Sequence, residues 1–275
     1  MNPERPTIGW LDGPREWLDA FGEVARFGSR VAGIVLSGRG FRYFGEGLRQ
    51  AGILIFGSAL IIWAFVFIIG LQCGVQGAYF NRSVGAPSLA GLFSSYCDLR
   101  EAVPYAFGYI LSAKVGTGIV AELGAMRISD EIDALEVMGV EPVTFLAATR
   151  LIGAWIAIPF LYLVGIGVAF LASYFAVVQQ VGDVSSGGYL LIFWMFQSPP
   201  DVLFSLIKGM VMATIIVLVG CYYGYTASGG PIGALGFEPQ KTIVPSIPTM
   251  CTTMMLTTID FAVAVPTPIG PPEAV

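Results

Sequence analysis

The sequence predicts an all-α integral membrane protein, and three observations lead to that class. Of its 275 residues, 55% are hydrophobic and 12% are charged, and the charged share is about half of that in a typical soluble domain. Several apolar runs have the roughly 20 residues that a helix needs to cross a bilayer. An amphipathic segment precedes the first of these runs. We see no linker and no internal repeat, so we interpret residues 1–275 as one domain.

Five apolar runs qualify as transmembrane helices. The second of them contains Lys114, the fourth Lys208 and the fifth Asp260. A charge exposed to lipid is costly, so we expect the spans to form a bundle whose interfaces shelter these side chains. Gly70 and Gly74 have the four-residue spacing that lets two helices approach closely. The predicted spans are residues 51–71, 102–121, 151–178, 202–221 and 242–265.

The region before the first span, residues 14–50, opens with an amphipathic helix. Over residues 14–36, a helical period places Trp17, Phe21 and Val24 on one side and most of the charged residues on the other. Such a helix typically lies flat in the headgroup region of a membrane. We therefore expect an interfacial helix, with a packing helix on the soluble side as the alternative.

The basic residues predict the orientation of the chain. With a cytoplasmic N-terminus, ten of the 14 Lys and Arg residues fall in inner segments, and only Arg82 and Arg100 fall in outer ones. Cytoplasmic loops of membrane proteins carry such an excess of positive charge. Five spans then place the C-terminus outside. The polar segment between the second and third spans, residues 122–142, faces the cytoplasm.

Within that polar segment, residues 129–139 predict a short helix. Ser129 is a suitable N-cap, and Asp130 and Glu131 fill the first turn, where the helix dipole favours negative charge. Gly139 suits the position just after the helix. These signals indicate a helix of about three turns that stays close to the membrane.

The two faces of this helix differ in chemistry. Ile132 and Leu135 lie on one face, and Asp130, Asp133 and Glu136 lie on the opposite arc. One interpretation is a solvated helix that only connects two spans. The other is a docking element whose apolar ridge and acidic flanks fit the groove of a partner. The periodicity does not choose between them.

The residue inventory excludes several kinds of protein. Histidine is absent, which removes His-based acid–base catalysis and most zinc sites, and no basic patch favours nucleic acid. No GxxxxGK[ST] motif occurs, so the chain is not expected to hydrolyse ATP by itself. We predict no catalytic residue, metal or cofactor in this chain. Cys73 and Cys97 are expected on the same side of the membrane, where they would form either a disulfide or two separate buried thiols.

The stretch ELGAMRISDEIDALEVMGVEP, residues 122–142, closely resembles the signature of the MlaE/YrbE permease family. Arg100-Glu101 followed by Pro104 resembles the entry to that family's second span, and CYYGYTASGGPIG, residues 221–233, resembles its glycine-rich loop. The resemblance covers roughly residues 40–260, with the YrbE type of actinobacterial Mce systems as the nearest. The chain departs from the family at residues 234–242, which lack the usual arginine.

The resemblance implies a membrane subunit of an ABC transporter in the plasma (inner) membrane. Its short polar helix would be the coupling helix that contacts a cytoplasmic ABC ATPase dimer, which holds the ATP and Mg. Further expected partners are a second YrbE-type permease subunit and MCE-domain proteins on the outer side. The implied coupling residues are Glu122, Arg127, Asp130, Glu131, Asp133 and Glu136, with Ile132, Leu135 and Met138 as apolar anchors.

The function that the resemblance implies is ATP-driven movement of lipids or other hydrophobic molecules across the inner membrane together with MCE proteins. The cargo would be a fatty acid, a phospholipid or a sterol, and the expected direction is import. The alternatives are an intramembrane lipid-modifying enzyme and a non-transporting membrane scaffold. Candidate residues of the substrate pathway are Tyr109, Lys114, Met254 and Asp260. Lys114 has a structural alternative, which is pairing with Glu101 or Asp260 or reaching to the interface.

Overall fold

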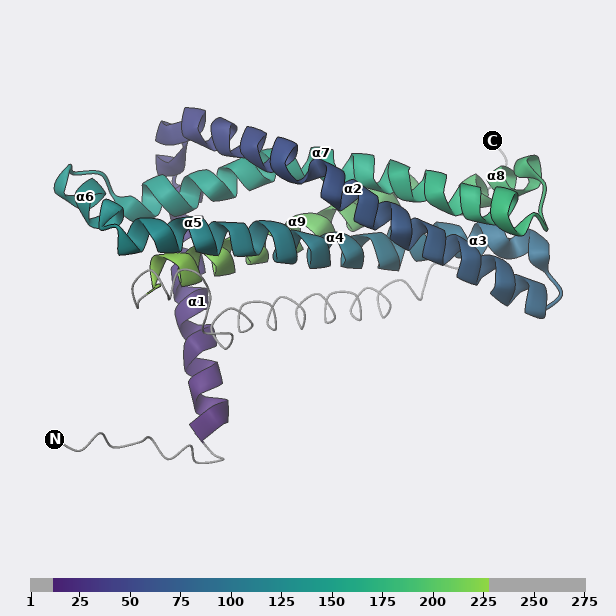
Figure 1. The fold of residues 1–275 in the computed structure, drawn as a ribbon, viewed down its shortest axis with the longest axis horizontal. Coiled ribbons are helices and arrows are strands. Elements are labelled where there is room, and N and C mark those ends of the chain that lie inside the picture. The colour runs from purple at the N-terminus through teal and green to yellow at the C-terminus, as the bar shows by residue number, and fades with distance from the viewer. Residues whose placement is uncertain (1–11, 228–275) are drawn as a thin grey trace.

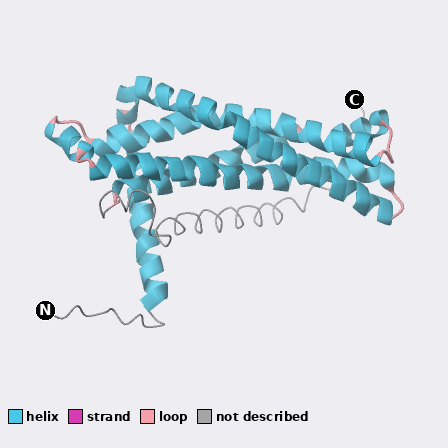
Figure 2. Cartoon of the chain, viewed as in Figure 1, coloured by secondary structure: helices cyan, strands magenta, loops and turns pink. Residues whose placement is uncertain are grey.

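A computed structural model describes residues 12–227, and its helices form an elongated bundle (Figure 1). Figure 2 shows that helices joined by short turns account for the described part of the chain. The helices are α1 (Asp12–Leu36), α2 (Phe44–Ser83), α3 (Ala90–Tyr96), α4 (Val103–Leu111), α5 (Thr117–Ile128), α6 (Glu131–Val137), α7 (Thr149–Tyr174), α8 (Ser186–Met195) and α9 (Pro199–Tyr225). Short 3-10 turns cover Arg39–Tyr43 and Pro87–Leu89, and π-helical turns cover Cys97–Ala102, Ser112–Gly116, Val143–Ala148 and Phe175–Val181.

Four stretches of the described residues are long and apolar enough to cross a membrane, and they contain the first four predicted spans. Each stretch is longer than its prediction, because helical hydrogen bonding continues beyond the part that needs lipid. The first stretch has 40 residues, or about 60 Å of helix, against a hydrocarbon core of about 30 Å. The fifth predicted span, residues 242–265, lies outside the described residues, so the count of five stays a prediction. The stretches are Phe44–Ser83, Pro87–Ile128, Val143–Val181 and Pro199–Tyr225.

Close packing of α2 on α7 forms much of the bundle, and small residues make it possible. A Cβ atom at Gly70 would lie 2.5 Å from the carbonyl oxygen of Ala169, and one at Gly74 would lie 2.8 Å from the Cβ of Ala176. No side chain fits at either glycine without moving the opposite backbone. The predicted packing role of these two glycines is confirmed, and it follows from the general need of membrane helices for small residues at their contacts.

The second membrane-crossing stretch is a chain of short helices. The π-helical turns Cys97–Ala102 and Ser112–Gly116 join α3 to α4 and α4 to α5. A π-turn shifts the backbone hydrogen bonds of a helix by one residue, and such turns are frequent at functional sites. The first turn carries Arg100 and Glu101, and the second carries Lys114.

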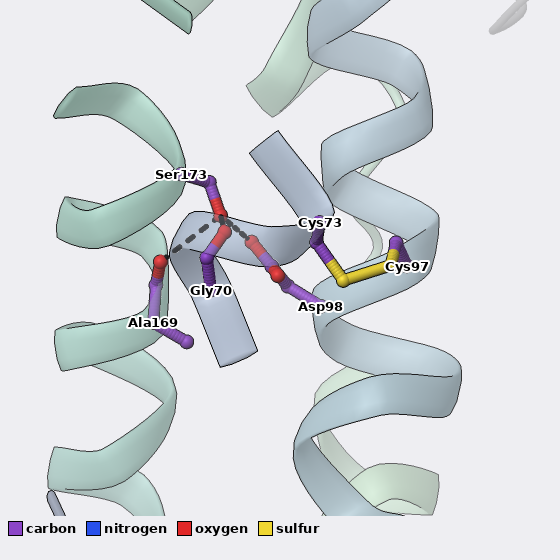
Figure 3. The surroundings of a disulfide bond; sticks show 6 residues. All are labelled: Gly70, Cys73, Cys97, Asp98, Ala169 and Ser173. Carbon is purple, nitrogen blue, oxygen red and sulfur yellow. Dashed lines mark hydrogen bonds between the residues drawn. A yellow bond between two sulfur atoms is a disulfide. The ribbon is translucent and has the colours of Figure 1, made fainter. Parts of the chain in front are cut away.

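A disulfide joins Cys73 of α2 to Cys97, the first residue of the first π-turn, with Cα atoms 6.0 Å apart. Figure 3 shows the neighbouring residues: the hydroxyl of Ser173 on α7 points toward the carboxylate of Asp98 and the carbonyl oxygens of Gly70 and Ala169. The structure therefore selects the disulfide over the two buried thiols. The covalent bond fixes the π-turn to α2 beside a buried polar contact.

The N-terminal helix α1 runs at a steep angle to the bundle axis (Figure 1). Its C-terminal half packs against the end of α9, where the ring of Phe27 contacts Tyr222 with centroids 5.7 Å apart. The hydroxyl of Tyr222 donates to the carboxylate of Glu23 at 2.5 Å. A helix crossing the end of the bundle at this angle is compatible with the predicted interfacial position, which stays a prediction.

Candidate functional site

The short helix α6 turns the chain between the second and third membrane-crossing stretches, at one end of the bundle (Figure 1). It covers Glu131–Val137, within the predicted 129–139. The prediction that Ser129 is its N-cap is wrong, because the Ser129 hydroxyl donates to the carbonyl oxygen of Ala125 at 3.0 Å and ends α5. Asp130 makes the turn with a φ of 58°, a left-handed conformation that Asp adopts more readily than most residues.

The end of α6 has the glycine that the sequence indicates. Gly139 has a φ of 77°. Its N–H donates to the carbonyl oxygen of Glu136 at 3.0 Å, and the N–H of Val140 donates to that of Leu135 at 3.0 Å. These two bonds form a Schellman motif, which confirms the predicted stop.

The outward surface of α6 is acidic and carries two exposed apolar side chains, Val137 and Met138. Ile132 is 1% exposed and belongs to the bundle core, and Leu135 packs half-buried against that core. Neither residue is therefore presented as an anchor for a partner in this structure. The exposed apolar side chains are Val137, at 89%, and Met138, at 69%. We call the exposed residues Asp130, Glu131, Glu136, Val137 and Met138 the coupling surface, after the role that the resemblance implies for this helix.

Three of the implied coupling residues make ion pairs within the chain. Arg127 and Asp133 pair at 2.5 Å between Nη1 and Oδ1, which ties α6 to α5. Glu122 pairs with Arg150 at 2.8 Å between Oε1 and Nη2. Arg150 is one of the ten basic residues of the predicted inner segments, and no further role was predicted for it. An arginine at the start of an apolar span is itself a signal for a buried partner.

A second group of charges lies in the half of the bundle that ends in α3 and α8. Arg100 pairs with Asp201 at 2.9 Å between Nη2 and Oδ1, and its guanidinium lies 4.4 Å from the ring centroid of Tyr96. The buried Lys208 donates to the carbonyl oxygen of Arg100 at 2.6 Å. Glu101 is half-buried beside them. We call Arg100, Glu101, Asp201 and Lys208 the charged cluster.

Backbone carbonyl oxygens of the first π-turn accept hydrogen bonds from side chains of α9 and so hold this cluster against that helix. The hydroxyl of Ser205 donates to the carbonyl oxygen of Leu99 at 2.6 Å and is 2.5 Å from the hydroxyl of Tyr162. Ser205 and Lys208 are three residues apart and therefore share one face of α9. Lys208 was expected as a charge within a span, whereas Asp201 was not predicted. Asp201 forms a capping box with Ser198 at the start of α9, and this pattern is a signal that the sequence contains.

The other predicted pathway residues are dispersed. Lys114 is exposed and makes no ion pair with any residue of 12–227, so Glu101 is not its partner here. Tyr109 is 50% exposed and stacks between Tyr105 and Phe65, with ring centroids 6.5 and 6.2 Å away. Met254 and Asp260 lie outside the described residues.

An apolar groove of about 400 Å³ lies between α7 and α9. The indole N–H of Trp155 donates to the hydroxyl of Thr214 at 2.9 Å across it. Both hydrogen-bonding groups are thereby satisfied, and the remaining lining is aliphatic. The lining residues are Trp155, Met210, Val211, Thr214 and Ile215. A groove of this composition suits a hydrocarbon chain better than a polar molecule.

These helices define a multi-pass membrane protein with charges gathered at two places. The family described as "Permease MlaE" matches residues 48–262, and the chain belongs to that family. A "Probable ABC transporter permease protein" of Rickettsia prowazekii is 30% identical over 217 residues, covering 78% of this chain and 83% of the relative. A protein of that same description from Synechocystis is 26% identical, covering 74% and 75%. A chloroplastic Arabidopsis thaliana protein named trigalactosyldiacylglycerol 1 is 29% identical, covering 73% and 55%.

Proposed function

We propose that this chain is the permease subunit of an ATP-driven transporter that imports a lipid across the inner membrane together with MCE proteins. A permease role and an ATPase partner follow from the family and from relatives named as ABC transporter permeases. The coupling surface is the proposed contact site for the ATPase, because it is exposed and acidic and lies at the end of a hairpin that two ion pairs hold together. We further propose a second YrbE-type permease subunit as a partner.

The observation that carries the orientation is the disulfide. Cys97 directly follows α3, and Figure 1 shows α3 at the end of the bundle opposite α6. Disulfides persist in oxidising compartments outside the cytoplasm. The coupling surface then faces the cytoplasm, where the ATPase is. The distribution of arginines along the sequence gives the same sidedness by a separate route.

Two features support a lipid as the class of cargo. The charged cluster offers both signs of charge inside a membrane-crossing region, where such residues mark functional sites by default. The groove between α7 and α9 is apolar. Together they suit an amphiphile with a polar head and hydrocarbon tails. The name of the Arabidopsis relative is that of a glycerolipid, which favours the same class.

A labelling experiment tests the orientation. Met138→Cys places a thiol on an exposed side chain of the coupling surface. We expect a membrane-impermeant maleimide to leave this thiol unlabelled in intact cells and to label it after the membrane is opened. The parent protein, treated in parallel, gives the background from Cys221 and Cys251. Labelling of Met138→Cys in intact cells would reverse the sidedness.

Reconstitution tests the function. The chain, its second permease subunit and the ATPase are placed in vesicles, and transfer of a fluorescent phospholipid from MCE-bearing donors into these vesicles is followed. We expect lipid transfer only with hydrolysable ATP, and no ATP turnover by the purified chain alone. ATP turnover by the purified chain alone would contradict its role as a subunit powered by a separate ATPase. Assembly with the ATPase but without any lipid movement would support the scaffold.

A further inference from the structure

The ion pair between Glu122 and Arg150 closes the base of the hairpin that carries α6. Glu122 lies in α5 and Arg150 lies at the start of α7, so the ion pair joins the two ends of the segment 123–149, which contains α6. The atoms Oε1 and Nη2 are 2.8 Å apart. The Arg150 side chain is 5% exposed, whereas Glu122 is 55% exposed.

The burial of Arg150 makes Glu122 necessary. A guanidinium stays charged in proteins and therefore needs an anion when it is buried. Its Nη1 donates to the carbonyl oxygen of Leu146 at 3.1 Å, and its Nε has no hydrogen-bond partner in the described structure. The Glu46 carboxylate, also near, is bound to Arg49 and Gln50. Glu122 is the carboxylate that contacts the buried cation.

Further contacts hold the hairpin above this pair together. Asp133 of α6 is bound to Arg127 of α5 at 2.5 Å, and Ile132 anchors α6 in the bundle core. α6 is thus tied to α5, and α5 is tied to α7 through Glu122 and Arg150. The second tie therefore adds a direct side-chain contact between the two membrane-crossing stretches, besides the backbone that joins each of them to α6.

We propose that Glu122 and Arg150 are positioning residues that make α5 and α7 move together when the ATPase displaces α6. This inference rests on the proposed function. It assigns Glu122 to force transmission through Arg150, and not to direct contact with the ATPase. Without the pair, ATP hydrolysis continues but the displacement of α6 is no longer shared by both stretches, so less lipid moves for each ATP.

The test is the ratio of lipid transferred to ATP hydrolysed in the reconstituted complex. Glu122→Gln keeps the shape and removes the charge, and we expect the ratio to fall by about 2- to 30-fold, the range for mutations that alter coupling between sites. Glu122→Asp retains the carboxylate and should recover part of the loss. Arg82→Gln is the matched control, because it breaks the Arg82–Asp183 pair at the opposite end, 3.5 Å long, and should leave the ratio unchanged.

A covalent replacement separates transmission from folding. In the Glu122→Cys/Arg150→Cys double variant both charges are absent, and a short reducible thiol cross-linker joins the two positions. We expect the ratio to be low before cross-linking, restored by it, and lost again on reduction. A wild-type ratio in folded Glu122→Gln, or no recovery on cross-linking, overturns the inference alone. Absence of ATP-dependent transfer by the unaltered complex overturns the proposed function, and the inference with it.

Discussion

Replacing both Glu131 and Glu136 by lysine is expected to abolish association with the ATPase. Both carboxylates are exposed on the coupling surface, and their reversal sets positive charge against a groove that must be complementary to an acidic helix. Placing like charges together costs several kcal/mol at an interface, which corresponds to at least about 100-fold weaker binding. Asp130 is left unchanged because its left-handed φ of 58° would strain a lysine.

The measurement is the amount of ATPase that co-purifies with the permease, at increasing salt. Wild-type association should weaken as salt rises, because surface charges are screened. The control is Gln179→Lys/Gln180→Lys, which adds two lysines at exposed positions toward the other end of the bundle and should retain the ATPase. If the Glu131→Lys/Glu136→Lys variant held the ATPase at wild-type stoichiometry, α6 would be a connecting helix and not a docking element.

Replacing Lys208 by methionine is expected to reduce lipid transfer by at least about 10-fold. A hydrogen bond to a charged group contributes on the order of 1.5–3 kcal/mol to a folded arrangement, and its loss at Lys208 should weaken the arrangement that transport needs by a comparable factor. The ammonium group is buried, donates to the carbonyl oxygen of Arg100 at 2.6 Å and lies near Glu101. Methionine keeps most of the volume but removes the charge and the donor. The first π-turn would lose its polar tie to α9, and the charged cluster would lose one of its two cations.

The measurement is lipid transfer per amount of assembled complex, with ATPase co-purification as the test of folding. Lys208→Arg retains the positive charge and should recover part of the activity, although its larger head crowds the buried site. Full transfer by folded Lys208→Met would show that the charged cluster is dispensable for transport. Equal loss in the arginine and methionine variants would indicate that size, and not charge, matters at this position.

The sequence by itself determined the class of the protein and the elements with local signals. Composition and four of the apolar runs fixed a multi-pass helical membrane protein, because a lipid environment leaves few alternatives to the helix. Gly139 predicted the end of α6, since the left-handed conformation after a helix strongly favours glycine. The block at residues 122–142 carried the family resemblance, which the match over residues 48–262 confirms.

Only the tertiary structure decided which distant residues meet. The ion pairs Glu122–Arg150 and Arg100–Asp201 and the disulfide Cys73–Cys97 each join separate helices. Their formation depends on the rotation and register of neighbouring helices, which the hydrophobic period of a single segment does not specify. The same limit applies to Ile132, whose side chain is buried in the core of the bundle. Local patterns set what each helix is, and packing in three dimensions set what it contacts.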